Sequence, residues 1–135
     1  MPTILIVDDS ENALLIAHDV LLSEGYSVAT CLNPENDLLK MLGDTQVENG
    51  GIDLILMDVT MPGKSGDQWV KELKQGDYGA RVKKVKMVLY SSLPEENLDQ
   101  LASQSNADGY ILKRDIFTLI KGVKKYVGNN QPTSE

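Results

Sequence analysis

Five polar residues that could do chemistry each follow an apolar run in this chain. They are three acids, one hydroxyl and one amine: Asp8, Asp9, Asp58, Ser91 and Lys113. Carboxylate oxygens are the ligands that a hard divalent cation such as Mg²⁺ prefers. An ammonium and a hydroxyl can each hold a phosphoryl oxygen. If the fold brings these residues together, the set can bind a divalent cation and hold a phosphoryl group.

The apolar runs before these residues indicate how the residues are positioned. The runs are short and nearly continuous, and they cover Thr3–Val7, Ile52–Met57, Lys86–Tyr90 and Gly109–Leu112. Such runs are typical of strands that are buried on both faces of a parallel sheet. Ligands of these sheets bind outside the carboxyl ends of the strands, where the strand order reverses. The five polar residues are therefore expected to meet at one edge of one sheet.

Helices are expected to alternate with the strands five times along the chain. A more polar run, Ser27–Cys31, predicts a further strand at or near the edge of the sheet. The expected helices run from Ser10 to Glu24, from Pro34 to Leu42, from Asp67 to Gln75, onward from Leu93, and from Asp115 to Val127. Polar connections are expected over Asp44–Gly51 and Gly76–Lys84. The pattern predicts an α/β fold, a doubly wound parallel sheet with right-handed crossovers and helices on both faces.

Composition narrows the possible partners and locations of the protein. The chain has 135 residues, which suits one domain with a single core, and a net charge of -7, which argues against nucleic acid as a partner. No apolar stretch is long enough to span a membrane, and strand-like residues begin at once, so no signal peptide is expected. The single cysteine, Cys31, suits a reducing cytoplasm and is expected to be a packed thiol.

In this order, and each at a strand end, the five residues resemble the receiver domain of two-component response regulators in its single-domain, CheY-like form. The resemblance also includes the segment DLILMDVTMPG around Asp58, and Tyr110 shortly before Lys113. It implies a flavodoxin-like (βα)5 fold with strand order 2-1-3-4-5. It further implies a receiver domain over residues 1–127, followed by a polar tail over 128–135.

The resemblance implies a role for each residue of the acidic set. Asp58 would accept a phosphoryl group and form an acyl phosphate. Asp9 and Asp58 would bind Mg²⁺ (or Mn²⁺) directly, Asp8 would bind it through water, and Thr60 would offer its backbone carbonyl. Lys113 would pair with a carboxylate at rest and with a phosphoryl oxygen after transfer. Without metal, repulsion among the three carboxylates is expected to raise at least one pKa.

The resemblance also implies a switch and its partners. Phosphorylation adds about 1.5 to 2 negative charges, so Ser91 would move toward the phosphoryl group and Tyr110 would turn inward. The surface of the helix opened by Leu93, the last strand and the last helix would change. The donor would be a histidine kinase or a histidine phosphotransfer protein, and the target is an unknown protein. Phosphorylation-dependent dimerisation is left open, and no enzyme activity beyond self-phosphotransfer and self-dephosphorylation is expected.

Two departures from the family pattern carry their own expectations. Arg114 stands where the family usually has a proline, often after a cis bond, so the Lys113–Arg114 bond is expected to be trans or a strained cis. Thr60 and Leu93 flank the site and are neither charged nor amides. Neither offers an obvious means of positioning a hydrolytic water, and slow self-dephosphorylation is therefore expected.

Other interpretations of the same residues remain. Asp8 and Asp9 could simply cap a helix, and Ser91 and Tyr110 could be ordinary turn and strand residues. A phosphatase of the haloacid-dehalogenase type would need an acid where Thr60 stands. A dinucleotide-binding module would need a glycine-rich turn after the first strand, where Asp8, Asp9 and Ser10 stand. The alternative kept beside the switch is a degenerate receiver that binds its partner independently of phosphorylation.

Overall fold

A five-stranded parallel sheet forms the centre of the molecule. The computed structural model describes residues 2–43, 51–75 and 85–127. The strands are β1 (Thr3–Val7), β2 (Ser27–Cys31), β3 (Leu54–Met57), β4 (Lys86–Ser91) and β5 (Gly109–Leu112). Their order is β2-β1-β3-β4-β5, and all neighbours pair in parallel. The predicted flavodoxin-like order is confirmed, with β2 and β5 at the two edges.

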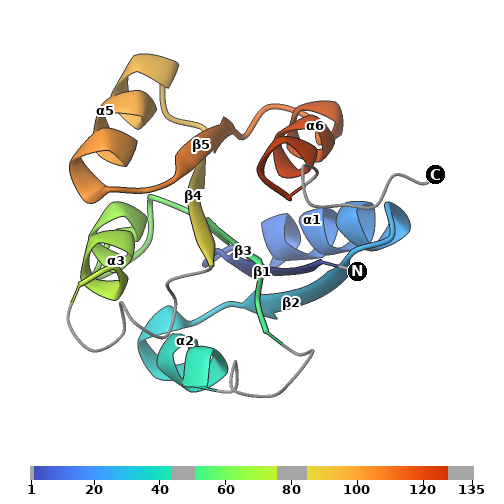
Figure 1. Ribbon diagram of the computed structural model, residues 1–135, viewed down its shortest axis with the longest axis horizontal. Helices are drawn as coiled ribbons and strands as arrows, with labels where there is room; N and C mark the ends of the chain where they lie inside the picture. The colour runs from blue at the N-terminus through green and yellow to red at the C-terminus, as the bar shows by residue number, and fades with distance from the viewer. Residues whose placement is uncertain (1, 44–50, 76–84, 128–135) are drawn as a thin grey trace.

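Helices cover both faces of this sheet (Figure 1). The helices are α1 (Glu11–Ser23), α2 (Pro34–Gly43), α3 (Gly66–Leu73), α5 (Glu95–Ser105) and α6 (Ile116–Val127). α1 and α6 lie on one face, and α2, α3 and α5 lie on the other. None of the helices in the described ranges is long and apolar enough to cross a membrane.

The alternation of side chains along the strands explains the two layers. In β1, Ile4 and Ile6 pack into the core under α1 and α6, while Leu5 and Val7 pack into the core under α2, α3 and α5. All four side chains are buried. An inner strand of a parallel sheet must be apolar on both faces, because helices cover each of them. The apolar runs of the sequence therefore position the polar residues that follow them.

Element boundaries differ from the sequence prediction by one or two residues. β3 begins at Leu54 rather than Ile52. Asp53, the residue before the strand, accepts a hydrogen bond on its carboxylate from the Thr3 amide. α3 begins at Gly66, after the Ser65 amide donates to Gln68 Oε1, and it ends at Leu73. Ser10 caps α1 as predicted, since its Oγ accepts from the Ala13 amide at 3.2 Å.

Three predicted segments lie partly or wholly outside the described residues. These are the connections Asp44–Gly51 and Gly76–Lys84 and the tail Gly128–Glu135. Their predicted structures stay predictions.

Candidate functional site

Three carboxylates meet at the carboxyl ends of β1 and β3. Asp8 and Asp9 follow β1, Asp58 follows β3, and each offers an oxygen within 4.8 Å of those of the other two. The Asp8 amide donates to the Cys31 carbonyl at 3.1 Å, and the Asp58 amide donates to the Val7 carbonyl at 2.9 Å. These bonds continue the sheet past the strand ends and fix the backbone of both acids. Asp8 and Asp58 are 2% and 6% exposed, whereas Asp9 is exposed.

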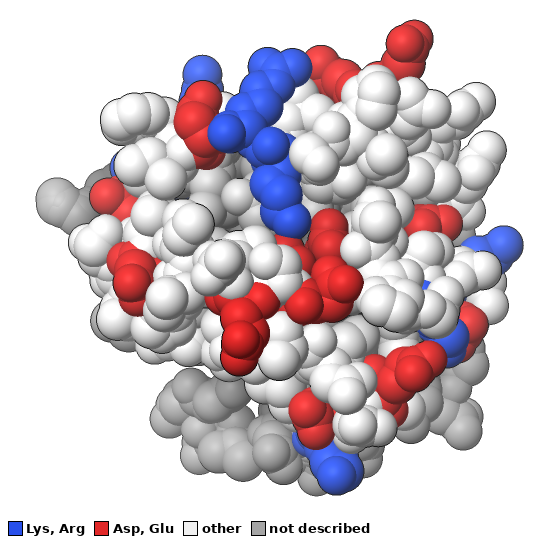
Figure 2. Space-filling view, turned by 180° about the vertical axis from the view of Figure 1, so that it is seen from behind, with Lys and Arg blue, Asp and Glu red and all other residues white. Residues whose placement is uncertain are grey.

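Lys113 brings one positive charge to this cluster. Its Nζ lies 2.6 Å from Asp8 Oδ2 and 3.5 Å from Asp58 Oδ1. The Lys113 amide donates to the Ser91 carbonyl at 2.8 Å, which holds the end of β5 against the end of β4. On the face behind the view of Figure 1, a run of basic side chains ends on a group of acidic ones (Figure 2). One ammonium within reach of two buried carboxylates, with a third beside them, leaves the cluster short of positive charge.

Burial and charge together raise the pKa of Asp58 to about 6. Burial is the largest cause, and the Asp8 and Asp9 charges raise the pKa further, while the Lys113 ammonium lowers it. The predicted rise of a carboxyl pKa is confirmed, but desolvation contributes more than the predicted repulsion. Cys31, 2% exposed, is the packed thiol that was expected, and burial raises its pKa to about 11.

The donor set of this cluster fits a hard divalent cation. All three ligand atoms are carboxylate oxygens, and the exposed position of Asp9 leaves room for the waters that Mg²⁺ usually retains. Thr60 is exposed and follows Asp58 by two residues in the loop toward α3. The structure therefore brings Asp8, Asp9, Asp58 and Lys113 together as the sequence predicted.

Ser91 and Tyr110 lie beside this cluster in defined resting contacts. Ser91, 2% exposed, ends β4, and its Oγ accepts from the Leu93 amide at 3.1 Å. Tyr110 lies in the edge strand β5, and its hydroxyl donates to Glu95 Oε2 at 2.9 Å on the surface. Both residues thus have partners other than the three carboxylates, and their switch roles stay predictions.

Two residues close to the site were not singled out in the sequence. The Tyr90 ring lies with its centroid 5.2 Å from Lys113 Nζ, within the range of a cation–π contact. A Cβ at Gly66 would overlap the Asp58 carbonyl, so only glycine lets the start of α3 pack this closely. The turn-rich segment Met61–Gly66 is a signal for Gly66, but nothing in the sequence distinguishes Tyr90 from an ordinary core residue.

The departure at Arg114 is resolved by the backbone. No cis peptide bond occurs within residues 2–43, 51–75 and 85–127, so the Lys113–Arg114 bond is trans. The Arg114 amide donates to the Leu112 carbonyl at 3.1 Å, a tight turn that follows β5 directly.

Comparison with known proteins agrees with this fold and shows the family of the chain. The family model described as "Response regulator receiver domain" matches residues 4–124, so the chain belongs to that family. The chemotaxis protein CheY of Treponema pallidum is 32% identical over 111 residues, covering 82% of this chain and 71% of that protein. CheY of Bacillus subtilis is 30% identical over 110 residues, covering 82% and 83%.

Solved structures show the same architecture. Response regulator TrrA of Thermotoga maritima, solved in complex with Mg²⁺ and beryllofluoride, is 30% identical with a TM-score of 0.73. The match covers 93% of this chain and 99% of that one. Receiver domains of this family are signalling switches of two-component systems, and they interact with histidine kinases and downstream targets.

Proposed function

We propose that this protein is a phosphoacceptor receiver in which Asp58 takes a phosphoryl group from a histidine kinase or a histidine phosphotransfer protein. One observation carries the proposal. The Asp58 carboxylate lies at the end of a central strand, with two more carboxylates within 4.8 Å and the Lys113 ammonium 3.5 Å away. A nucleophile, a set of metal ligands and a cation for the transferred group are thus in one place.

The transfer requires positioning more than strong nucleophilicity. An Asp58 oxygen attacks phosphorus, the bond from phosphorus to the donor histidine nitrogen breaks, and that nitrogen leaves with the electron pair and regains a proton. Lys113 then pairs with a phosphoryl oxygen. Its ammonium, which at rest pairs with Asp8, is shared between Asp8 and the new group. The chain gains one acyl phosphate, and no other covalent bond within the chain changes.

The same acids would hold the Mg²⁺ (or Mn²⁺) that this chemistry needs. Asp9 and Asp58 would be direct ligands, Asp8 would bind through water and Thr60 would offer its backbone carbonyl. When bound, the ion neutralises charge that develops on the transferred phosphoryl group. The presence of Mg²⁺ with beryllofluoride in the TrrA structure supports this assignment.

The resting contacts of Ser91 and Tyr110 suggest how the signal would spread. A hydrogen bond from the Ser91 hydroxyl to a phosphoryl oxygen would pull Ser91 away from the Leu93 amide and shift the loop before α5. Tyr110 would leave Glu95, the first residue of α5, and turn inward. The surface of α5, β5 and α6 would then differ between the two states, and a target protein or a second copy of the chain would bind it.

We further propose the extent and location of the receiver. Residues 1–127 form it, residues 128–135 are a polar tail, and the protein acts in the cytoplasm. Slow self-dephosphorylation is proposed because Thr60 and Leu93 offer no charged or amide group near the site.

Phosphorylation by acetyl phosphate tests the proposal. The protein is incubated with acetyl phosphate and Mg²⁺, and the acyl phosphate is detected by intact mass and by phosphate-affinity gel. Asp58→Asn is the test variant, and Asp37→Asn, which removes an exposed acid on α2, is the matched control. We expect the wild type and Asp37→Asn to be labelled, and no labelling of Asp58→Asn or of any sample without metal.

Two results would contradict the proposal. A folded wild type that is labelled neither by acetyl phosphate nor by a phosphorylated histidine phosphotransfer protein would favour the degenerate, phosphorylation-independent binding module. Labelling that persists in Asp58→Asn would place the acceptor elsewhere.

A further inference from the structure

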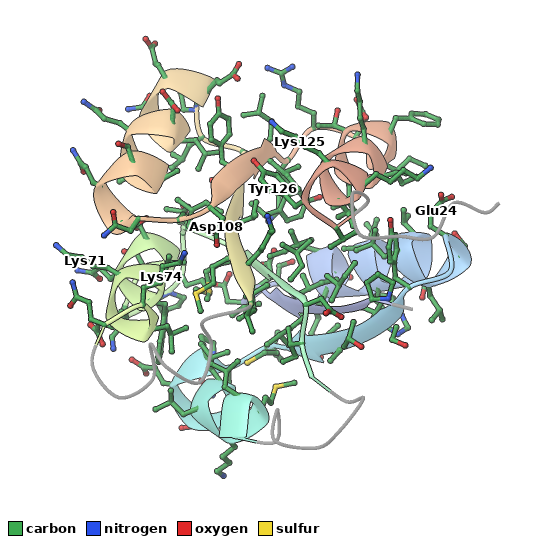
Figure 3. All side chains as sticks on the ribbon, in the orientation of Figure 1. Glu24, Lys71, Lys74, Asp108, Lys125 and Tyr126 are labelled. Carbon is green, nitrogen blue, oxygen red and sulfur yellow. The ribbon has the colours of Figure 1, made fainter. Side chains whose placement is uncertain are left out.

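At Tyr110, one side chain from α6 covers the free edge of β5. Tyr126 lies between α6 and β5 (Figure 3). Its hydroxyl accepts a hydrogen bond from the Tyr110 amide at 3.2 Å and donates one to the Tyr110 carbonyl at 3.4 Å. A tyrosine hydroxyl can do both at once, because it has one proton and two lone pairs. Both backbone groups of Tyr110 that face the edge therefore have a partner.

Two glycines make this close contact possible. A Cβ at Gly109 would overlap the Tyr126 hydroxyl, and a Cβ at Gly122 would lie 2.6 Å from Ile111 Cγ1. Gly122 and Tyr126 are four residues apart on α6 and so share one face of the helix. Gly109 precedes Tyr110 in the strand. Gly109 thus leaves room for the hydroxyl, while Gly122 lets α6 approach Ile111 of β5.

The contact falls on the residue whose side chain is proposed to switch. Tyr110 is held at two places, its backbone by Tyr126 and its hydroxyl by Glu95 at 2.9 Å. The backbone contact is half-buried, whereas the contact with Glu95 is exposed to solvent. Water competes with the exposed bond more readily, so the side chain is easier to release than the backbone.

The surroundings show what a partner would meet. A groove of about 610 Å³ lies here, lined among others by Glu95, Tyr110, Ile111, Lys121, Lys125 and Tyr126. An open strand edge in such a groove would offer backbone groups to an added strand. At Tyr110 these groups are already bonded, so the groove presents side chains.

We propose that Tyr126 is a positioning residue for the switch. Its hydroxyl fixes the backbone of Tyr110, so that phosphorylation appears as rotation of the Tyr110 side chain and not as movement of β5. The partner accordingly reads side chains of the groove and does not add a strand at Tyr110. This inference rests on the proposed function for its consequence, but the contact itself can be tested independently.

Amide hydrogen exchange tests the contact. Tyr126→Phe removes the hydroxyl and keeps the ring, while Lys125→Met removes the ammonium 5.4 Å from that ring and keeps the hydroxyl. We expect exchange at the Tyr110 amide to accelerate on the order of tenfold in Tyr126→Phe and to stay unchanged in Lys125→Met. The Lys113 amide, bonded to Ser91, is the internal control. Equal protection of the Tyr110 amide in wild type and Tyr126→Phe would overturn the proposal.

A second measurement tests whether Tyr126 matters for switching. It must respond to activation, and a residue that only stabilised the fold would not change it. Beryllofluoride with Mg²⁺ mimics the phosphoryl group, and the Tyr110 ring and amide are followed by NMR. In the wild type we expect the ring resonance to shift while the amide stays protected. In Tyr126→Phe we expect the amide to lose protection on activation. An amide that loses protection in the wild type as well would show that β5 moves, against the proposal.

These measurements distinguish a failure of the proposed phosphorylation of Asp58 from a failure of the proposed role of Tyr126. Acetyl phosphate labelling is measured in the same samples, so an inactive Asp58 shows up as absent labelling and an absent ring shift. In that case the exchange result at rest still decides whether Tyr126 holds the Tyr110 backbone. Gly109→Ala reaches the same contact from the strand, and adding Tyr126→Phe to it should not accelerate exchange further. If Gly109→Ala fails to fold, Tyr126→Phe alone decides.

Discussion

The acidic cluster and the β5–α6 contact differ in how their polar groups are paired, although Lys113 of the cluster lies only three residues after Tyr110 of the contact. At the cluster, one ammonium lies within 3.5 Å of two buried carboxylates, and a third carboxylate is close by. At the β5–α6 contact, a neutral hydroxyl satisfies one amide and one carbonyl. The first region keeps an excess of negative charge, and the second keeps none.

The difference shows what each region can contribute. Buried charges without enough partners cost stability, but they leave the site able to take up a cation and a phosphoryl group. Satisfied neutral groups add little binding capacity, yet they hold a backbone in place whatever the charge nearby. A switch needs both kinds of region. The charge must change at one site, and a partner must recognise the result on a surface whose backbone stays in place.

The largest effect on this comparison is expected from Lys113→Met. It leaves the buried Asp8 carboxylate without its ammonium, which should lower the free energy of unfolding at pH 7 by about 3 kcal/mol or more. The measurement is urea unfolding of the metal-free protein.

Lys64→Met is the matched control for Lys113→Met. Lys64 Nζ also lies 2.6 Å from a carboxylate oxygen, of Glu72, but that carboxylate is 58% exposed. Loss of this ion pair, together with the contact between Lys64 and the Trp69 ring, should lower the free energy of unfolding by about 1 kcal/mol or less. Equal losses in the two variants would contradict the view that burial makes the Lys113 pair special.

Asp58→Asn should have the next largest effect, and it should stabilise the protein. The pKa of Asp58 is raised to about 6 in the folded chain, so folding favours the protonated carboxyl. This stabilisation is complete below about pH 4 and is lost as the pH rises to about 6. At pH 7 the variant should be more stable than wild type by up to about 3 kcal/mol. Unfolding measured from pH 4 to 7, with Asp37→Asn as the charge control, checks this.

Magnesium should reverse that difference in part. At a concentration ten times its dissociation constant, a cation that binds only the folded wild type adds about 1.4 kcal/mol. Asp58→Asn should gain less, because it lacks one carboxylate of the cluster. A variant that is not stabilised at pH 7 would show that burying the Asp58 charge costs nothing. A variant that gains as much from Mg²⁺ as wild type would show that Asp58 is not a ligand of the ion.

Much of the fold and the cluster could be predicted from the sequence, and the reasons are physical. Buried parallel strands must be apolar on both faces, so their ends are visible, and the polar residues at those ends must share one edge. The sequence cannot say that Lys113 Nζ lies closer to Asp8 than to Asp58, because that depends on a side-chain rotamer. It also cannot reveal the Tyr126–Tyr110 contact, which depends on how α6 is rotated against β5.

Gly109→Ala is expected to have a moderate effect at the second region. The added methyl would overlap the Tyr126 hydroxyl and force α6 or β5 to shift, which typically costs about 1–3 kcal/mol. Thermal unfolding measures it. Gly25→Ala is the comparison, since its Cβ would meet nothing within 4 Å and only its φ of 96° is unfavourable. A smaller loss from Gly109→Ala than from Gly25→Ala would show that α6 does not press on β5.

Control variants aside, Tyr126→Phe should have the smallest effect on stability, although it removes the contact itself. One neutral hydroxyl that serves two backbone groups contributes about 1 kcal/mol net, because the Tyr110 amide and carbonyl are only partly buried and water can replace it. Lys125→Met should change stability by less than about 0.5 kcal/mol. Chemical unfolding at pH 7 and again at pH 5 sharpens the contrast. The loss in Tyr126→Phe should be the same at both pH values because the contact carries no charge, whereas the gain in Asp58→Asn should shrink at the lower one.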